Sequence, residues 1–190
     1  MHTLIPLFPL SAHLLPGGRL ALRIFEPRYV RMVKEACAKN TGIGMCMLDA
    51  KAEIATNQHI LPIGTYARII DFDLLKDGLL GITVEGERCF TIGTIHTEAD
   101  GLRVGECEWL DGWDLQLEHQ QLQPMVSRLK EIFATYPDIS DLYNDPKFND
   151  ASWVVYRWLE LLPIDAPYKQ QLLSQQDGVK ALEYLTQLVK

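Results

Sequence analysis

Cysteine is scarce in this sequence, and its placement excludes the usual zinc-binding motifs. The cysteines form no CxxC pair and have no histidine at zinc-finger spacing. With 190 residues and 47% apolar composition, the chain is long enough to bury a hydrophobic core without stabilising disulfide bonds or metal ions. We therefore expect reduced, mostly buried thiols at Cys37, Cys46, Cys89 and Cys107.

A long apolar run is also missing. No segment approaches the roughly 20 apolar residues that a helix needs to cross a bilayer. The start, MHTLIPLFPL, lacks the basic region and the small-residue cleavage site of a signal peptide. We therefore expect a cytoplasmic protein with no membrane partner.

Positive charge is in short supply. The sequence has 18 lysines and arginines against 25 aspartates and glutamates, a net charge of -7. Nucleic-acid binding draws most of its affinity from lysines and arginines that neutralise phosphates. The charge balance therefore disfavours RNA and DNA as partners.

Motifs that carry catalysis are absent as well. No GxxxxGK[ST] phosphate-binding loop occurs, and no nucleophile has a recognisable activating base. His96 and Glu98 would share one face of a strand, but a metal site needs at least three converging ligands. Asp71, Asp73 and Asp77 lack the Gly and Glu spacing of a calcium loop. We expect no enzyme activity, no catalytic residue, no metal and no cofactor.

What is present divides the chain into residues 1–112 and 113–190. The first part alternates short runs rich in Ile, Val, Leu, Thr and aromatic residues with glycine turns, which is typical of strands. Dense strands with short links predict a closed or nearly closed antiparallel β-barrel. The predicted strands are Leu4–Phe8, Arg19–Ile24, Ile43–Leu48, Gly64–Phe72, Leu79–Glu85, Cys89–His96 and Leu102–Trp109.

One helix is predicted inside this β-rich part. Pro27 suits its first position, where a backbone N–H would have no helical partner. The helical spacing of Tyr29, Val33, Ala36 and Cys37 defines a face that packs on the barrel. The opposite face, with Arg28 and Arg31 among others, would meet water or a partner.

Helical periodicity replaces the strand pattern after Trp113. The first predicted helix runs through Leu122 to Phe133 with Pro124 in its first turn, and a loop follows to Asp150. A second helix ends at Pro163, and Asp165 and Asp177 mark the starts of a third and a fourth. The prediction is an α+β protein. A β-barrel with one inserted helix forms the first part of the chain, and a helical bundle forms the second.

Several motifs resemble the Lon N-terminal domain family. They are IPLFPL at 5–10, PGG at 16–18, LRIFEPRYVRMV at 22–33, the IGTxA strand at 63–67, VEGERCF at 84–90 and LLPIDAPYKQQLL at 161–173. Their order and spacing agree with the family over nearly the whole chain. Cys89 is a departure, because the family commonly has an arginine there, so a basic contact at that position is not expected.

The resemblance implies a PUA-like barrel and a non-catalytic domain that recognises protein substrates. The partners it implies are unfolded client proteins, together with an ATP-dependent protease or a chaperone. The predicted site is a groove between barrel and helices. Its candidate residues are Phe25, Glu26, Arg28, Tyr29, Arg31, Trp109 and Trp113.

Within this set the side chains have different expected places. Phe25 and Tyr29 belong to the apolar side of the helix start and are expected in the core, whereas Arg28 and Arg31 are expected at the surface. Two of the four tryptophans, Trp153 and Trp158, are five residues apart on one helix and are not expected to be buried equally.

Two other functions remain open. PUA-like barrels often bind RNA, although fold alone does not confer function and the acidic charge opposes it. A small-molecule pocket in the barrel mouth or between the two parts is the other alternative.

Overall fold

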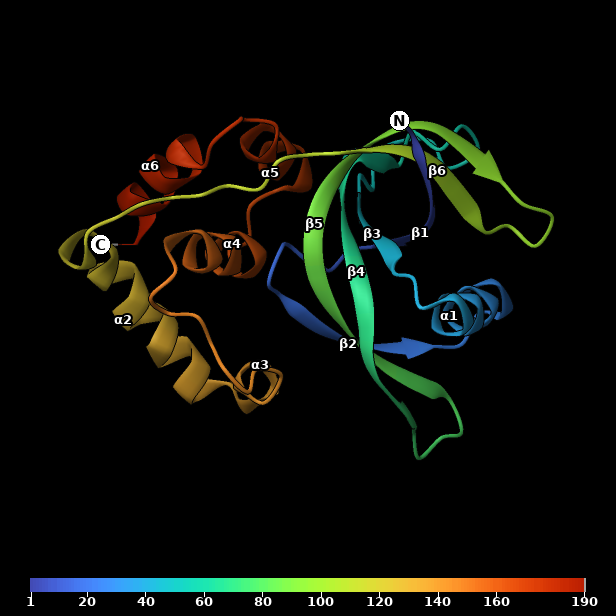
Figure 1. Ribbon diagram of the computed structural model, residues 1–190, viewed down its shortest axis with the longest axis horizontal. Coiled ribbons are helices and arrows are strands. Elements are labelled where there is room, and N and C mark those ends of the chain that lie inside the picture. Colours follow the sequence, from blue (N-terminus) through green and yellow to red (C-terminus); the bar gives the residue numbers. More distant parts are fainter. Residues whose placement is uncertain (190) are drawn as a thin grey trace. The chain divides into compact units, whose positions relative to one another are not determined.

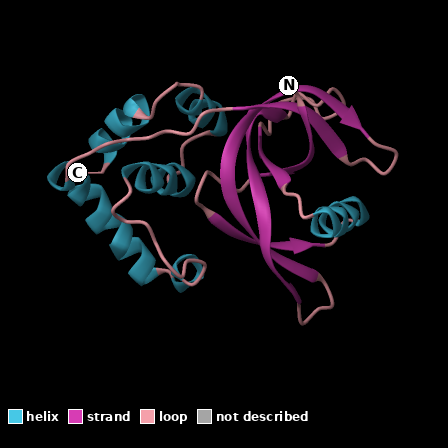
Figure 2. Cartoon of the chain, in the orientation of Figure 1, coloured by secondary structure: helices cyan, strands magenta, loops and turns pink. Residues whose placement is uncertain are grey.

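The computed structural model describes residues 1–189. The chain forms two compact units, Met1–Asp111 and Gly112–Lys190, which we call unit 1 and unit 2 and describe separately. Unit 1 contains all the strands and a single helix, whereas the described part of unit 2 contains helices and loops only (Figure 2). Of the helices within residues 1–189, none has the length and apolar character needed to traverse a bilayer.

Unit 1 is a β-barrel built mainly from five strands. Neighbouring strands pair in the order β5(Leu80–Thr97), β4(Ile60–Leu74), β3(Ile43–Leu48), β1(Thr3–Leu10) and β6(Arg103–Trp109), and β6 pairs back onto β5 to close the ring (Figure 1). The sixth strand, β2(Arg19–Ile24), pairs with β5 outside this ring. The predicted α+β class, with a barrel followed by helices, is confirmed.

Two details of the predicted barrel are wrong. β1 pairs with β3 in parallel, so the barrel is not purely antiparallel. The predicted strands Leu79–Glu85 and Cys89–His96 are one long strand, β5, which continues through Gly86. The absence of a side chain at Gly86 lets the backbone of Leu15 pack closely against β5, because an added Cβ would lie 2.4 Å from the carbonyl oxygen of Leu15.

The helix α1(Pro27–Lys39) covers the larger of two apolar clusters in unit 1. Its buried side chains are Tyr29, Met32, Val33 and Ala36, which pack with barrel residues of that cluster. Cys37 is exposed, which corrects the expectation that it lies on the packed face. Met32 occupies that face instead, because residues 29, 32, 33 and 36 form the narrower helical stripe.

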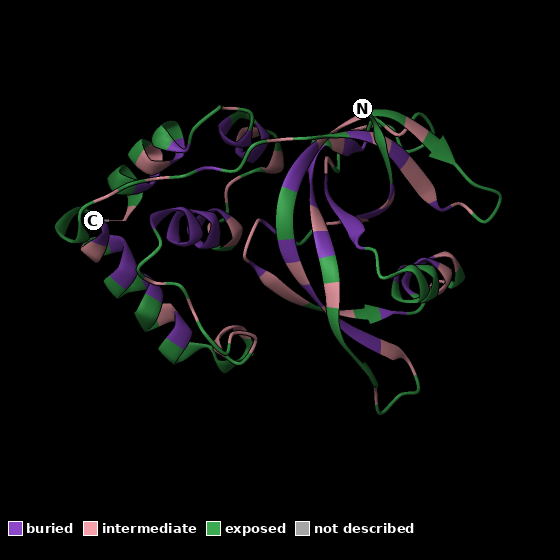
Figure 3. Cartoon of the chain, in the orientation of Figure 1, coloured by how far each residue is buried: buried purple, intermediate pink, exposed green. Residues whose placement is uncertain are grey.

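Unit 2 is organised around a buried helix. Its helices are α2(His119–Thr135), α3(Pro137–Ser140), α4(Ala151–Leu161), α5(Ala166–Leu173) and α6(Val179–Leu188). Residues 151–159 of α4 are all buried (Figure 3). This helix packs against α2 and α6.

Trp153 and Trp158 are both buried, contrary to expectation. Trp153 packs edge-on against the rings of Phe133, Tyr143 and Phe148, which supply an aromatic cluster for it. The Trp158 indole N–H donates to the Met125 carbonyl at 3.2 Å. The helix can bury both rings because it has packing partners on more than one side.

The position of Pro124 is a further correction. A capping box between Glu118 and Gln121 starts α2 at His119, so Pro124 lies inside the helix, beyond its first turn. The short helix α3 also lies in the stretch predicted to be a loop.

The close approach at Gly86 gives a stability prediction. Gly86→Ala should lower the free energy of unfolding by about 1–3 kcal/mol, because the new methyl group meets backbone that cannot rotate away. Urea denaturation measures the change. Gly112→Ala is the control, since no atom lies within 4 Å of its added Cβ, and it should stay within about 0.5 kcal/mol of the wild type. Equal effects of the two substitutions would contradict the steric explanation.

Candidate functional site

A cavity of about 410 Å³ in unit 1 brings together four of the seven predicted site residues. We call it the Phe25 groove. Its walls come from the ends of β1, β2 and β3, the start of α1, the loop before β4 and the start of β6. It is lined by Phe8, Pro9, Leu10, Leu22, Arg23, Ile24, Phe25, Glu26, Arg28, Tyr29, Leu48, Ile54, His59 and Arg103.

The step from β2 into α1 determines which side chains enter the groove. Successive residues of a strand point to opposite faces, and Ile24 is buried while Phe25 is 67% exposed. Glu26 remains extended as the N-cap residue, and Pro27 then begins the helix. The expectation that Phe25 is a core residue is therefore wrong, whereas Tyr29 is buried as expected.

Apolar side chains dominate the groove. At its base, the rings of Phe8 and Tyr29 lie 4.3 Å apart between centroids. Phe25 and Ile54, which is 64% exposed, present large apolar groups to solvent. Exposed apolar side chains that gather around a concave surface are typical of a protein or ligand interface.

Arg28 is held at the groove by several contacts. Its guanidinium pairs with Glu26 at 2.9 Å, donates to the Gly101 carbonyl at 3.2 Å and lies 5.0 Å from the centre of the Tyr29 ring. Burial raises the pKa of the Tyr29 hydroxyl, and the positive charge of Arg28 opposes that shift. Tyr29 is therefore a neutral wall of the groove at physiological pH.

Two polar residues of the groove were not identified from the sequence. Arg103 donates from Nε to the Asn57 side-chain oxygen at 2.5 Å, and within residues 1–189 it forms no ion pair with a carboxylate. His59 is only 8% exposed, and its Nδ1 has no hydrogen-bond partner in the described part of the chain. Neither residue belongs to a motif, and their proximity depends on the fold.

The electrostatic surroundings of His59 favour its neutral form. Burial lowers the pKa of the imidazole, and the nearby charge of Arg103 lowers it further, while an interaction with the Glu53 backbone acts in the opposite direction. The groove thus contains a neutral imidazole beside a permanent cation.

Arg31 lies on the exposed face of α1, outside the lining of the groove. Its guanidinium pairs with Glu35 in the same helix and with Glu98 and Asp100 after β5. Hydrogen bonds from Arg31 lower the pKa of the Asp100 carboxyl to about 2. Arg31 therefore connects α1 to the β5–β6 turn.

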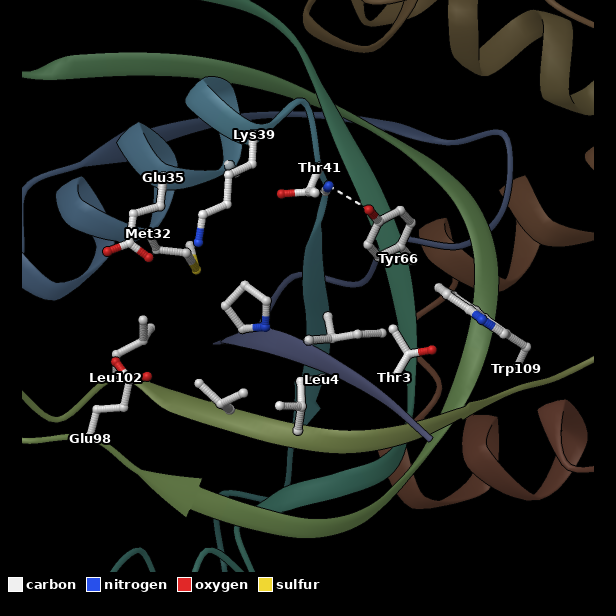
Figure 4. A pocket seen from close by; sticks show the side chains of 15 residues that line it. Thr3, Leu4, Met32, Glu35, Lys39, Thr41, Tyr66, Glu98, Leu102 and Trp109 are labelled. Carbon is white, nitrogen blue, oxygen red and sulfur yellow. Dashed lines mark hydrogen bonds between the residues drawn. The ribbon is translucent and has the colours of Figure 1, made fainter. Parts of the chain in front are cut away.

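Trp109 lines a second cavity in unit 1, of about 290 Å³ (Figure 4). Its ring meets Tyr66 edge-on at 5.3 Å, and the Tyr66 hydroxyl accepts a hydrogen bond from the Gly42 N–H at 2.5 Å. Glu35, Lys39 and Glu98 lie around this cavity with Met32 and Leu102. Its lining combines apolar and charged side chains, as the lining of the Phe25 groove does.

Trp113 belongs to unit 2 and is 8% exposed. It stacks on Tyr156 with ring centres 4.8 Å apart, and its indole N–H donates to the Gln175 carbonyl at 3.2 Å. These contacts make Trp113 part of the packing of unit 2.

Comparisons with known proteins agree on one family. The sequence model of the family described as the ATP-dependent protease La (LON) substrate-binding domain matches residues 4–190. The Lon protease of Parabacteroides distasonis is 26% identical over 177 residues, which cover 89% of this chain and 21% of that protein. The Lon protease of Amoebophilus asiaticus is 27% identical over 184 residues, covering 90% of this chain and 22% of that protein. The chain thus spans about a fifth of the length of these relatives.

Solved structures show the same architecture. A Lon N-terminal domain protein from Xanthomonas campestris superposes with a TM-score of 0.76 at 29% identity and covers 99% of both chains. The N-terminal domain of the Mycobacterium avium complex Lon protease gives a TM-score of 0.65 at 15% identity over 96% of both chains, which supports the fold alone.

The buried imidazole gives a prediction of pH dependence. The pKa of His59 is lower in the folded chain than its ordinary value of 6.5, so the unfolded chain binds the proton first as the pH falls. The wild type should therefore lose stability below about pH 6.5 through this residue. Urea denaturation at pH 7.5 and 5 should show a smaller loss in His59→Gln, which does not titrate. Equal losses in both proteins would contradict the lowered pKa.

The Arg31 cluster gives a second prediction. Arg31→Gln should return the pKa of the Asp100 carboxyl from about 2 toward its ordinary value of 3.8, because it removes the strongest donor to that carboxylate. NMR titration of the carboxyl carbons measures the change. Arg68→Gln, whose partner is Glu87, should leave Asp100 unaffected. An unchanged Asp100 pKa in Arg31→Gln would disprove the pairing.

Proposed function

This chain belongs to the ATP-dependent protease La (LON) substrate-binding domain family, and on that basis we propose that it binds apolar segments of unfolded proteins without cleaving them. The Phe25 groove is the proposed binding surface. The observation that carries this proposal is the pair of exposed apolar side chains, Phe25 and Ile54, on a concave apolar surface. Burying such groups is the main source of affinity for an unfolded chain.

The roles of the predicted site residues follow from their places in unit 1. Phe25 and Ile54 are the proposed anchors, and Tyr29 is the wall against which a bound side chain packs. Glu26 and Arg28 neutralise each other at the edge, where they are proposed to orient the bound chain through hydrogen bonds. Arg31 is proposed to act indirectly, by keeping α1 in place.

The arrangement of charges supports a protein ligand over a nucleic acid. Several surface arginines face carboxylates of the same chain, as in Arg19 with Glu85 at 2.6 Å and Arg68 with Glu87 at 2.7 Å. A paired guanidinium is less available to phosphate, and the net charge of -7 repels a polyanion. RNA binding by the barrel is therefore the weaker candidate.

We also propose that an ATP-dependent protease or a chaperone receives the bound client. The relatives named above are Lon proteases in which the matching region is about a fifth of the protein. A pull-down with the purified chain, probed for ATP-dependent proteases and chaperones, tests this step. Recovery of client proteins alone would contradict it.

The groove itself is tested by removing its anchors. The double variant Phe25→Ser with Ile54→Ser should weaken binding of fluorescently labelled unfolded casein by at least about tenfold, since each buried apolar side chain contributes about 1.5–3 kcal/mol. Fluorescence anisotropy measures the change.

A matched control is available in the β4–β5 hairpin. Phe72 and Leu74 are 68% and 73% exposed but lie outside the lining of the groove. Phe72→Ser with Leu74→Ser should leave casein binding within about twofold of the wild type. The reverse pattern, with loss in the hairpin variant only, would place the binding surface on the hairpin. Salt-dependent RNA binding that survives both variants would favour the other function.

A further inference from the structure

Arg103 is the exception among the arginines of the Phe25 groove. Arg23 pairs with Asp77 and Arg28 pairs with Glu26, whereas within residues 1–189 Arg103 donates only to the neutral amide oxygen of Asn57. A guanidinium has five N–H donors, so most of those on Arg103 are not used by the Asn57 bond. The described residues therefore leave one positive charge in the groove without a negative partner.

His59 supplies an independent sign of an absent ligand. Its Nδ1 is buried and has no hydrogen-bond partner within residues 1–189. A buried polar atom without a partner costs free energy, and a ligand that completes its hydrogen bond removes that cost. A neutral imidazole has one acceptor nitrogen, and Nδ1 is that acceptor when the ring proton is on Nε2.

The two groups lie close to each other in the groove. Arg103, His59 and Tyr29 all line the Phe25 groove. Asn57, two residues before His59, holds Arg103 from the same loop. Its backbone adopts φ of 61°, a left-handed conformation that asparagine tolerates better than most residues. The loop thus presents the hydrogen-bond acceptor and the cation together.

A ligand that matches this arrangement needs an anionic oxygen, an N–H donor and an apolar group. The last residue of a polypeptide has all three, because its carboxylate is adjacent to its own amide N–H and to its side chain. An internal segment of apolar residues offers carbonyl oxygens but no charge to neutralise Arg103. The observed chemistry therefore favours a chain end over the middle of a chain.

We propose that the Phe25 groove captures the free C-terminus of an apolar polypeptide, with its carboxylate on Arg103 and its last amide N–H on His59 Nδ1. The terminal side chain then packs among Phe25, Ile54 and Tyr29. This inference rests on the proposed function of the same groove and adds the part of the substrate that is recognised.

Three labelled peptides of one apolar sequence, ending in Ala-Leu-Phe, test this inference. The first has a free C-terminal carboxylate, the second a C-terminal carboxamide, and the third continues with a polar Gly-Ser-Gly-Ser tail. Fluorescence anisotropy with the full chain should show the first peptide binding at least about tenfold tighter than the other two, since a hydrogen bond to a charged group is worth about that factor.

Variants of the two polar residues assign the preference to the groove. Arg103→Gln should reduce the affinity for the carboxylate peptide to that for the carboxamide peptide, which itself should change little. Arg103→Lys keeps the charge and should retain part of the preference. His59→Phe, which removes the acceptor, should weaken binding of both peptides by about threefold or more. Arg68→Gln, an arginine outside the groove, is the matched control and should preserve the preference.

The outcomes separate this inference from the proposed function. Equal affinity for the three peptides, with loss of binding in the Phe25→Ser and Ile54→Ser double variant, would overturn recognition of the C-terminus and leave the groove as a binding site for apolar segments. Absence of saturable binding for all three peptides would overturn both. A carboxylate preference that survives in Arg103→Gln, with the fold intact by circular dichroism, would also overturn the assignment.

Discussion

The backbone pairing of β5 is the constraint on which unit 1 depends. This strand pairs with β4 over most of its length, with β2 near its start and with β6 in its second half. Register shifts in the β4 and β6 pairings curve it enough to close the ring, and Gly86 allows the backbone of Leu15 to approach. The pairing of β5 therefore determines where β2 ends and where β6 begins. The end of β2, the start of β6 and the start of α1 all contribute residues to the Phe25 groove.

The change from strand to helix after β2 explains why an apolar side chain faces water. Alternation of side chains along the strand buries Ile24 and turns Phe25 outward. The helix begins at Pro27, only two residues later, so no intervening loop covers the Phe25 ring. Arg28 then fastens the first turn of α1 to the Gly101 carbonyl. Exposure of Phe25 thus follows from the backbone geometry that joins β2 to α1, and the proposed function assigns this exposed ring to binding.

Most arginines of unit 1 lie beside carboxylates of the same chain. The Arg31 network with Glu98 and Asp100 links α1 to the β5–β6 turn, and other arginines face carboxylates on neighbouring strands or turns. Surface pairs of this kind add little stability individually, but they occupy the guanidinium groups of most arginines in unit 1. Against that background, Arg103 beside the buried His59 is chemically distinct. A chain with net charge -7 thereby keeps one cationic position within an apolar groove.

Local patterns in the sequence were enough to predict the strands of the barrel, the start of α1 at Pro27 and the helical second part, because alternation, helical spacing and capping depend on neighbouring residues. The motif around Phe25 also led to four residues of the groove. Only the tertiary structure decided that β1 and β3 are parallel, that β5 is continuous, and that Trp153 and Trp158 are both buried. It also brought Arg103 to Asn57, 46 residues away, beside His59. No periodicity encodes such a contact, because strand closure and loop packing join residues that share no local pattern.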